Sequence, residues 1–267
     1  MNKAIATVTI RYWLKTPLVV TGVVFLFGIY LCQCVMSYVS LQGIGHEGRW
    51  LELSDPTALV LVLGTGIIGR DITSGLLPLI FSRPITRTDY VLTKWLTLAI
   101  AASLITIFQL FFVHSWFLFW DQAGLSNLAF LAQIGTTIFT CTGLAAVVVM
   151  FSALRPGPFA GTGLWLLLYV LTQLMQQIGK QLPADPGPNP DASIAMLFNF
   201  FNFLRPVVGY LAEPLREFIA NGLALSDLLQ DNAIHWVLLS TYLFNLILVV
   251  VLAIYITNRK ELGYGSQ

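Results

Sequence analysis

The sequence predicts an all-α integral membrane protein with six transmembrane helices. Hydrophobic residues make up 57% of the 267 positions, charged residues make up only 10%, and the mean hydropathy is +0.78. These values exclude an ordinary soluble domain. Because a backbone in lipid must satisfy its own hydrogen bonds, the long apolar runs are expected to form helices. We expect a single membrane domain over residues 1–267, without internal repeats.

Residues 1–16 are predicted to form an amphipathic helix at the membrane interface. Cations interrupt the apolar pattern, so the segment does not read as a cleavable signal. One face gathers the apolar side chains of Ile5, Val8, Tyr12 and Leu14. The cations expected among lipid headgroups are Lys3, Arg11 and Lys15. The alternative is an unstructured lead-in to the first span.

Six apolar runs are long enough to cross a membrane, which takes about 20 residues for about 30 Å of hydrocarbon. The second run is the weakest, because Glu52 and Asp55 lie near its start. Five spans are thus predicted within residues 17–178, a sixth at 233–257, and a tail at 258–267. The runs are 17–38, 50–69, 95–116, 128–150, 159–178 and 233–257.

The distribution of Lys and Arg predicts that both termini face the cytoplasm. With the N-terminus inside, ten of these cations fall in cytoplasmic segments and the remaining four of the 14 fall outside. Cytoplasmic loops of membrane proteins carry such an excess of positive charge.

The connection over residues 179–232 is predicted to lie on the outer face. It begins with the Pro-rich stretch LPADPGPNPD, which cannot continue a helix. Two short helices are expected at 194–203 and 207–219, with a break at Arg205 and Pro206. A seventh span here is disfavoured by polar residues that are costly in hydrocarbon. The two helices either gate the outer mouth or only cap it.

The connection between the second and third runs, residues 64–94, reads GTGIIGRDITSGLLPLIFSRPITRTDYVLTK. Its apolar side chains recur at helical spacing, which predicts a short surface helix over 72–81. Gly75 and Pro78 keep that helix short. The residues that set the spacing are Ile72, Leu76, Leu79 and Ile80.

The polar residues of this segment have a distinctive order. Asp71 precedes Gly75 by four positions, and the later members are Pro84, Arg87 and Lys94. This spacing resembles the cytoplasmic loop of type-2 ABC exporter permeases, which usually carry a second acid where this chain has Thr73. The resemblance implies that 72–81 is a coupling helix that docks on an ATPase subunit. The implied ATPase-coupling residues are Asp71, Gly75, Leu76, Leu79, Arg83, Pro84, Arg87 and Lys94.

The same resemblance implies the partners. They are cytoplasmic ABC ATPase subunits, which bind ATP and Mg, and a second permease subunit, identical or different, in a prokaryotic inner (plasma) membrane. The alternative for 64–94 is an ordinary surface loop whose arginines follow the positive-inside bias.

The chain itself lacks the sequence motifs of an enzyme. It has no GxxxxGK[ST] phosphate loop, no HExxH and no GxSxG elbow. We therefore expect no cofactor and no ATP hydrolysis on this chain, and no nucleic-acid partner. A non-transporting membrane scaffold or assembly factor is the alternative function, and a membrane enzyme is disfavoured. No residue selects a substrate.

Polar residues within the predicted spans are candidates for a substrate path. In the fourth run they recur at i, i+3, i+4 and i+7, so they share one side of a helix. Such groups more often hydrogen-bond between helices. A metal site is not predicted, because Cys32 and Cys34 point to opposite sides of a helix and interfacial histidines are more often hydrated than metal-bound. The candidate path residues are Gln109, Gln133, Thr136, Thr137, Thr140 and Asn245.

Overall fold

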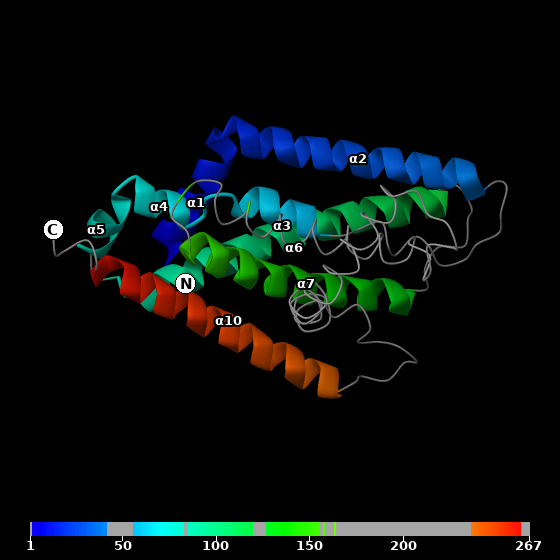
Figure 1. The fold of residues 1–267 in the computed structure, drawn as a ribbon. Coiled ribbons are helices and arrows are strands. Elements are labelled where there is room, and N and C mark those ends of the chain that lie inside the picture. Colours follow the sequence, from blue (N-terminus) through cyan, green and yellow to red (C-terminus); the bar gives the residue numbers. More distant parts are fainter. Residues whose placement is uncertain are drawn as a thin grey trace, which may run out of the picture.

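The fold is described from a computed structural model over residues 2–41, 56–82, 85–119, 127–154, 157, 163 and 236–262. In these ranges the chain forms eight helices and no strand, which confirms the all-α prediction for them. Figure 1 shows long helices running alongside one another, with the short helices α4 (Gly69–Thr73) and α5 (Leu76–Phe81) gathered at one end.

The first two helices, α1 (Lys3–Lys15) and α2 (Pro17–Leu41), meet at an elbow. The side chain of Asn2 caps α1 by accepting a backbone N–H hydrogen bond at 3.1 Å. Thr16 is extended, with φ −90 and ψ 107, as expected before a proline. The two helices are bent by 74°. If α2 crosses a bilayer, α1 therefore runs close to the membrane plane.

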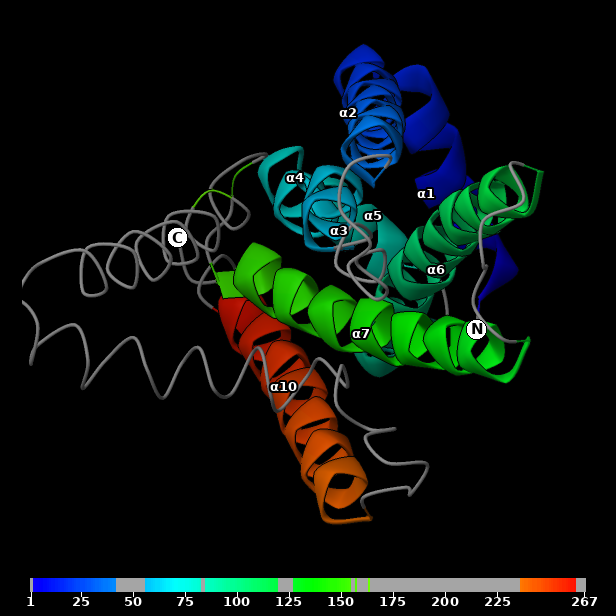
Figure 2. The same ribbon diagram turned by 90° about the vertical axis from the view of Figure 1, so that its right-hand side faces the viewer.

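Within the described residues, three helices are long and apolar enough to cross a membrane. They are α6 (Arg87–Phe119), α7 (Asn127–Leu154) and α10 (Trp236–Leu262), which fall on the predicted third, fourth and sixth spans. A fourth crossing is added if α1 and α2 form one bent span. In Figure 2, α2 and α10 lie on opposite sides of α6 and α7. In the most apolar stretch of α7, 67% is buried inside the protein, whereas in that of α10 only 17% is buried. Helix α7 is therefore the central helix.

The predicted second span ends earlier than its hydropathy indicated. Helix α3 (Thr57–Gly64) stops at Gly64 rather than at residue 69. A turn follows in which Gly66 has φ +67, a left-handed conformation that ends a right-handed helix. The apolar run continues through this turn with Ile67 and Ile68, which is why hydropathy alone placed the boundary too late.

The whole outer segment, 179–232, and the fifth predicted span apart from Gly163 lie outside the described residues. The same is true of residues 42–55, which include the start of the second predicted span. The count of six spans and the two outer helices at 194–203 and 207–219 therefore stay predictions.

Helix α3 lies close to α7 because Gly64 has no side chain. A Cβ placed on Gly64 would lie 2.3 Å from Cγ1 of Val148 and 3.3 Å from Cδ2 of Leu98. Both neighbours are buried, so neither moves aside without disturbing other contacts. Small residues allow the same close approach between helices in membranes generally.

We expect Gly64→Ala to lower the thermal stability of the purified protein, because overpacking a close contact costs about 1–3 kcal/mol. Thermal unfolding in detergent would measure the loss. The matched control is Gly135→Ala on α7, where an added Cβ meets nothing within 4 Å. Equal melting temperatures for the two variants would contradict the close approach of α3 to α7.

Candidate functional site

Residues 69–81 form two short helices, and not the single helix predicted over 72–81. Helix α4 ends at Thr73 and α5 begins at Leu76. Between them Gly75 has φ +66, and a Cβ placed there would meet nothing within 4 Å. The left-handed backbone, and not crowding, therefore favours glycine at this position. It also breaks the segment into two parts.

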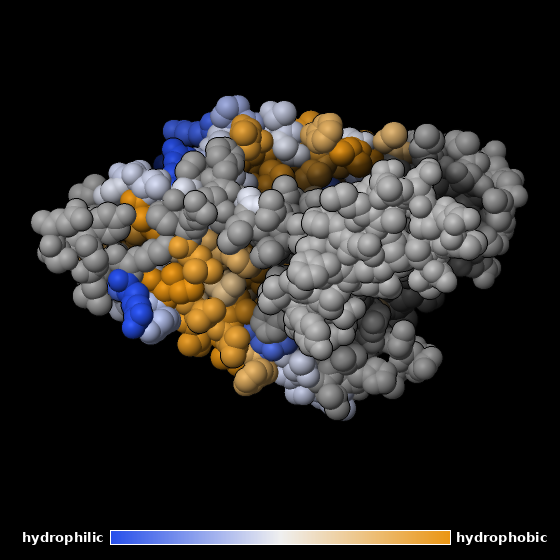
Figure 3. Space-filling view, in the orientation of Figure 1, coloured by the Kyte–Doolittle hydropathy of each residue, from blue (hydrophilic) through white to orange (hydrophobic). Residues whose placement is uncertain are grey.

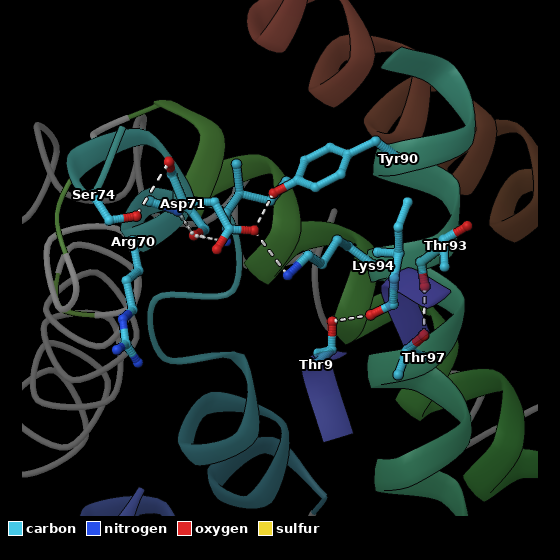
Figure 4. Close-up of polar contacts among 12 residues, drawn as sticks. Thr9, Arg70, Asp71, Ser74, Tyr90, Thr93, Lys94 and Thr97 are labelled. Carbon is cyan, nitrogen blue, oxygen red and sulfur yellow. Dashed lines mark hydrogen bonds and ion pairs between the residues drawn. The ribbon is translucent and has the colours of Figure 1, made fainter. Parts of the chain in front are cut away.

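The carboxylate of Asp71, on α4, is held by two side chains of α6. Its Oδ2 lies 2.9 Å from Nζ of Lys94 and accepts a hydrogen bond of 2.5 Å from the hydroxyl of Tyr90. Figure 4 shows the three side chains meeting between the two helices. The Lys94 side chain is 7% exposed and that of Asp71 is 17% exposed. A buried charge is costly without a partner, so this contact strongly favours the docked position of α4.

The first turns of α6 bring both partners of Asp71 to one face. Tyr90 and Lys94 are four positions apart, so their side chains are neighbours on the helix surface. The start of α6 is itself fixed by a capping arrangement. The N–H of Asp89 donates to Oγ1 of Thr86 at 3.1 Å, and the Thr86 hydroxyl donates to the Asp89 carboxylate at 2.7 Å.

The residue before Asp71 connects α4 to the N-terminal helix. The guanidinium carbon of Arg70 lies 4.1 Å from the centroid of the Tyr12 ring, within the range of a cation–π contact. Helix α1 is also bound to α6, because the backbone N–H of Asn2 donates to Oγ1 of Thr93 at 3.1 Å. Neighbouring residues of α4 thus contact α1 on one side and α6 on the other.

The turn before α4 is anchored on α7 by Ser152. The Ser152 Oγ accepts hydrogen bonds from the consecutive N–H groups of Ile68 and Gly69, at 3.1 and 3.0 Å. Ser152 is only 1% exposed. A Cβ on Gly69 would lie 2.5 Å from the carbonyl oxygen of Gly157, so the two backbones touch here. The start of α4, which we call its root, is therefore fixed by polar contacts and by close packing.

Helix α5 has a buried side and an exposed side. Leu77 is buried, and the ring of Phe81 packs edge-on against Tyr90 with centroids 5.7 Å apart. Leu76 is 44% exposed, although it is a large apolar residue. Ser74 and Gly75, which precede it, are exposed as well. Leu76 is thus an exposed apolar side chain at the end of the molecule where α4 and α5 lie.

Arg87, at the start of α6, connects this end of the molecule to the last helix. Its Nη1 donates to the backbone carbonyl of Asn258 on α10 at 3.4 Å. Its guanidinium carbon lies 5.6 Å from the centroid of the Phe81 ring. Arg87 therefore contacts both α5 and α10.

The structure brings together two of the eight predicted coupling residues, Asp71 and Lys94, in direct contact. Arg87, at the start of α6, contacts α5 and α10 nearby, and Leu76 is exposed. Arg83, Pro84 and the side chain of Leu79 lie outside the described residues. Sequence reasoning missed Tyr90, Ser152 and the contact of Arg70 with Tyr12. The spacing of Tyr90 to Lys94 on one helical face is the only signal that could have pointed to one of them.

The family model described as ABC-2 family transporter protein matches residues 17–262, nearly the whole chain. The chain belongs to the ABC-2 transporter family. Comparisons with curated proteins and with solved structures returned no significant match. The resemblance drawn from the spacing of residues 71–94 is thus confirmed at the level of the family. This ABC-2 permease is an integral membrane protein, and its family indicates a membrane subunit of a transporter rather than an enzyme.

The candidate path residues of the ABC-2 permease fall in different environments. Gln109 on α6 and Thr137 on α7 are buried. Thr136 donates its hydroxyl to the carbonyl of Gln133 at 3.0 Å, a bond within its own helix. The half-buried members are Gln133, Thr136, Thr140 and Asn245. Their role in a substrate path stays a prediction.

Proposed function

We propose that this ABC-2 permease is the transmembrane subunit of an ATP-driven exporter. Two permease subunits form the substrate path, and separate ATPase subunits bind and hydrolyse ATP with Mg. Membership of the family supports the transport role. The observation that carries the coupling role is the buried contact of Asp71 with Lys94 and Tyr90, because it ties an exposed surface segment to a long apolar helix.

The proposed contact with the ATPase is made by the exposed side of α5, centred on Leu76. When two ATPase subunits close on ATP, they displace α5 and, through the chain, α4. Because Asp71 is bound to Lys94 and Tyr90, a displacement of α4 is passed to the start of α6. The anchor at Ser152 lets α4 pivot at its root.

A second route leads to the first span. Arg70 contacts Tyr12 on α1, and α1 joins α2 through the elbow at Thr16. A displacement of α4 therefore acts on α1 and α2 as well as on α6. Rigid-body rocking of packed helices between two arrangements is a common form of such a switch. ATP drives it if the ATPase subunits bind ATP more tightly in one arrangement than in the other.

We place both termini in the cytoplasm, on the asymmetry of Lys and Arg. Single cysteines are introduced by Ser82→Cys, Ser266→Cys or Ser193→Cys into a chain without its natural cysteines. An impermeant thiol reagent applied to intact cells is expected to label position 193 and to spare positions 82 and 266. Labelling of position 266 from outside would contradict this orientation.

Reconstitution separates the exporter from a membrane scaffold. The permease is purified together with its ATPase partner and placed in lipid vesicles. An exporter is expected to alter the rate of ATP hydrolysis of that partner. A scaffold would hold the ATPase at the membrane without changing its rate, and this result would overturn the proposal.

A further inference from the structure

Helix α1 carries a row of cations along the side that faces away from the protein. Lys3, Arg11 and Lys15 are all exposed, and they fall at i, i+8 and i+12. Four-residue steps keep side chains on one slowly turning face of a helix, so the three form a stripe along α1. Thr7, also exposed, fills the missing i+4 position. We call Lys3, Arg11 and Lys15 the cationic stripe.

The opposite side of α1 is fully occupied by the protein. Ile5, Ala6, Thr9 and Trp13 are all less than a tenth exposed, and α1 packs on α6 through the contact of Asn2. Because this side of α1 is packed against the protein, the cationic stripe faces away from the protein. It points to whatever surrounds the molecule at the elbow between α1 and α2.

Within the residues that the structure describes, no acidic side chain balances the charge of the stripe. Helix α1 contains no Asp or Glu. Across the part of the chain that the structure describes, none of the three cations forms an ion pair. Three like charges within thirteen residues repel one another unless anions lie beside them. An anionic partner outside the described part of the protein would therefore stabilise the stripe.

The surroundings of the stripe favour lipid as the partner over protein or solvent. Large apolar residues lie exposed beside the cations, with Val8 65% and Leu14 72% exposed. The stripe ends next to α2, the apolar helix that α1 meets at 74°. Figure 3 shows this change from hydrophilic surface over α1 to apolar surface over α2. Mixed cations and apolar side chains on a helix near the membrane plane are suited to the boundary between headgroups and acyl chains.

We infer that the cationic stripe of α1 binds the headgroups of anionic phospholipids in the leaflet that borders the elbow. The phosphate groups accept hydrogen bonds from Lys3, Arg11 and Lys15 and balance their positive charge, while Val8 and Leu14 contact the acyl chains. Each such cation strengthens binding to an anionic surface by about five-fold. This binding requires only the fold of α1 and α2, and it does not depend on the presence of an ATPase.

The experiment uses the full chain in bilayers, without an ATPase. A fluorophore is attached at position 7, on the stripe, through Thr7→Cys in a chain without its natural cysteines. Phosphatidylglycerol or phosphatidylcholine with a nitroxide near the headgroup is then added as a quencher. We expect labelled phosphatidylglycerol to reach the same degree of quenching at a mole fraction at least about five-fold lower than that of labelled phosphatidylcholine. The preference is expected to shrink in concentrated salt, which screens charge.

Two variants test whether charge carries the effect. Lys3→Gln, Arg11→Gln and Lys15→Gln together are expected to bring the two quenching curves to coincide. Lys3→Arg, Arg11→Lys and Lys15→Arg keep the charge and are expected to keep the preference. Equal quenching by both lipids in the natural chain, or a preference that survives the glutamine variant, would overturn the inference. So would loss of ATPase binding by the glutamine variant in pure phosphatidylcholine, because the stripe would then be a protein contact.

Discussion

Asp71→Ala is expected to lower transport-coupled ATP hydrolysis by roughly ten-fold or more, while the protein still inserts into the membrane. The variant leaves Lys94 buried without its carboxylate, and removing one member of a buried pair costs about 3–5 kcal/mol. The docked position of α4 then loses its main polar contact with α6, so a displacement of α5 is no longer passed on. The rate of ATP hydrolysis in the reconstituted complex, with and without transport, measures the effect.

Two further variants make this prediction specific. Asp89→Ala removes an exposed acid from the same end of α6, where it caps the helix, and is expected to change coupling less than two-fold. The exchange of charges by Asp71→Lys with Lys94→Asp is expected to restore part of the lost coupling. If Asp71→Ala and Asp89→Ala behave alike, the contact with Lys94 does not carry the coupling.

Ser152→Ala is expected to have the second largest effect. It removes the acceptor of two consecutive buried N–H groups, those of Ile68 and Gly69, and each unsatisfied group costs about 1–3 kcal/mol. Because these groups fix the root of α4, we expect fewer transport events per ATP hydrolysed as well as a lower melting temperature.

The matched control for Ser152 is Thr106→Val, on α6. Thr106 is also 1% exposed, but its hydroxyl donates within its own helix, to the carbonyl of Ala102 at 2.9 Å. Its loss leaves no backbone N–H without an acceptor, so the control is expected to keep its coupling. A purely structural role for Ser152 would lower the amount of folded protein and leave the ratio of transport to ATP hydrolysis unchanged.

The long helices could be predicted from the sequence because each is a local pattern. The apolar runs that became α2, α6, α7 and α10 exceed the length of a crossing, and Pro17 marks the elbow. The end of α3 could not be placed in this way. The turn at Gly66 is apolar, and hydropathy does not distinguish an apolar turn from an apolar helix.

The candidate site was predictable only in part, for a similar reason. The spacing of Asp71 and Lys94 selected both residues, but their contact depends on how α4 docks against α6. Ser152 gives no signal, because a serine within an apolar helix usually bonds to its own backbone. Its partners lie more than 80 positions away in the chain. Contacts of that kind follow from tertiary packing, which local patterns do not encode.

In the proposed exporter, the ATPase acts on the exposed side of α5. A photoreactive amino acid at position 76, on the exposed side of α5, tests this action directly in the complex with its ATPase partner. The same group at position 104, an exposed leucine in the middle of α6, serves as the control. On illumination, position 76 is expected to crosslink to the ATPase subunit, more strongly with ATP bound, and position 104 is expected to give no such product. An intact complex that yields no ATPase crosslink from position 76 would show that the ATPase does not act on α5.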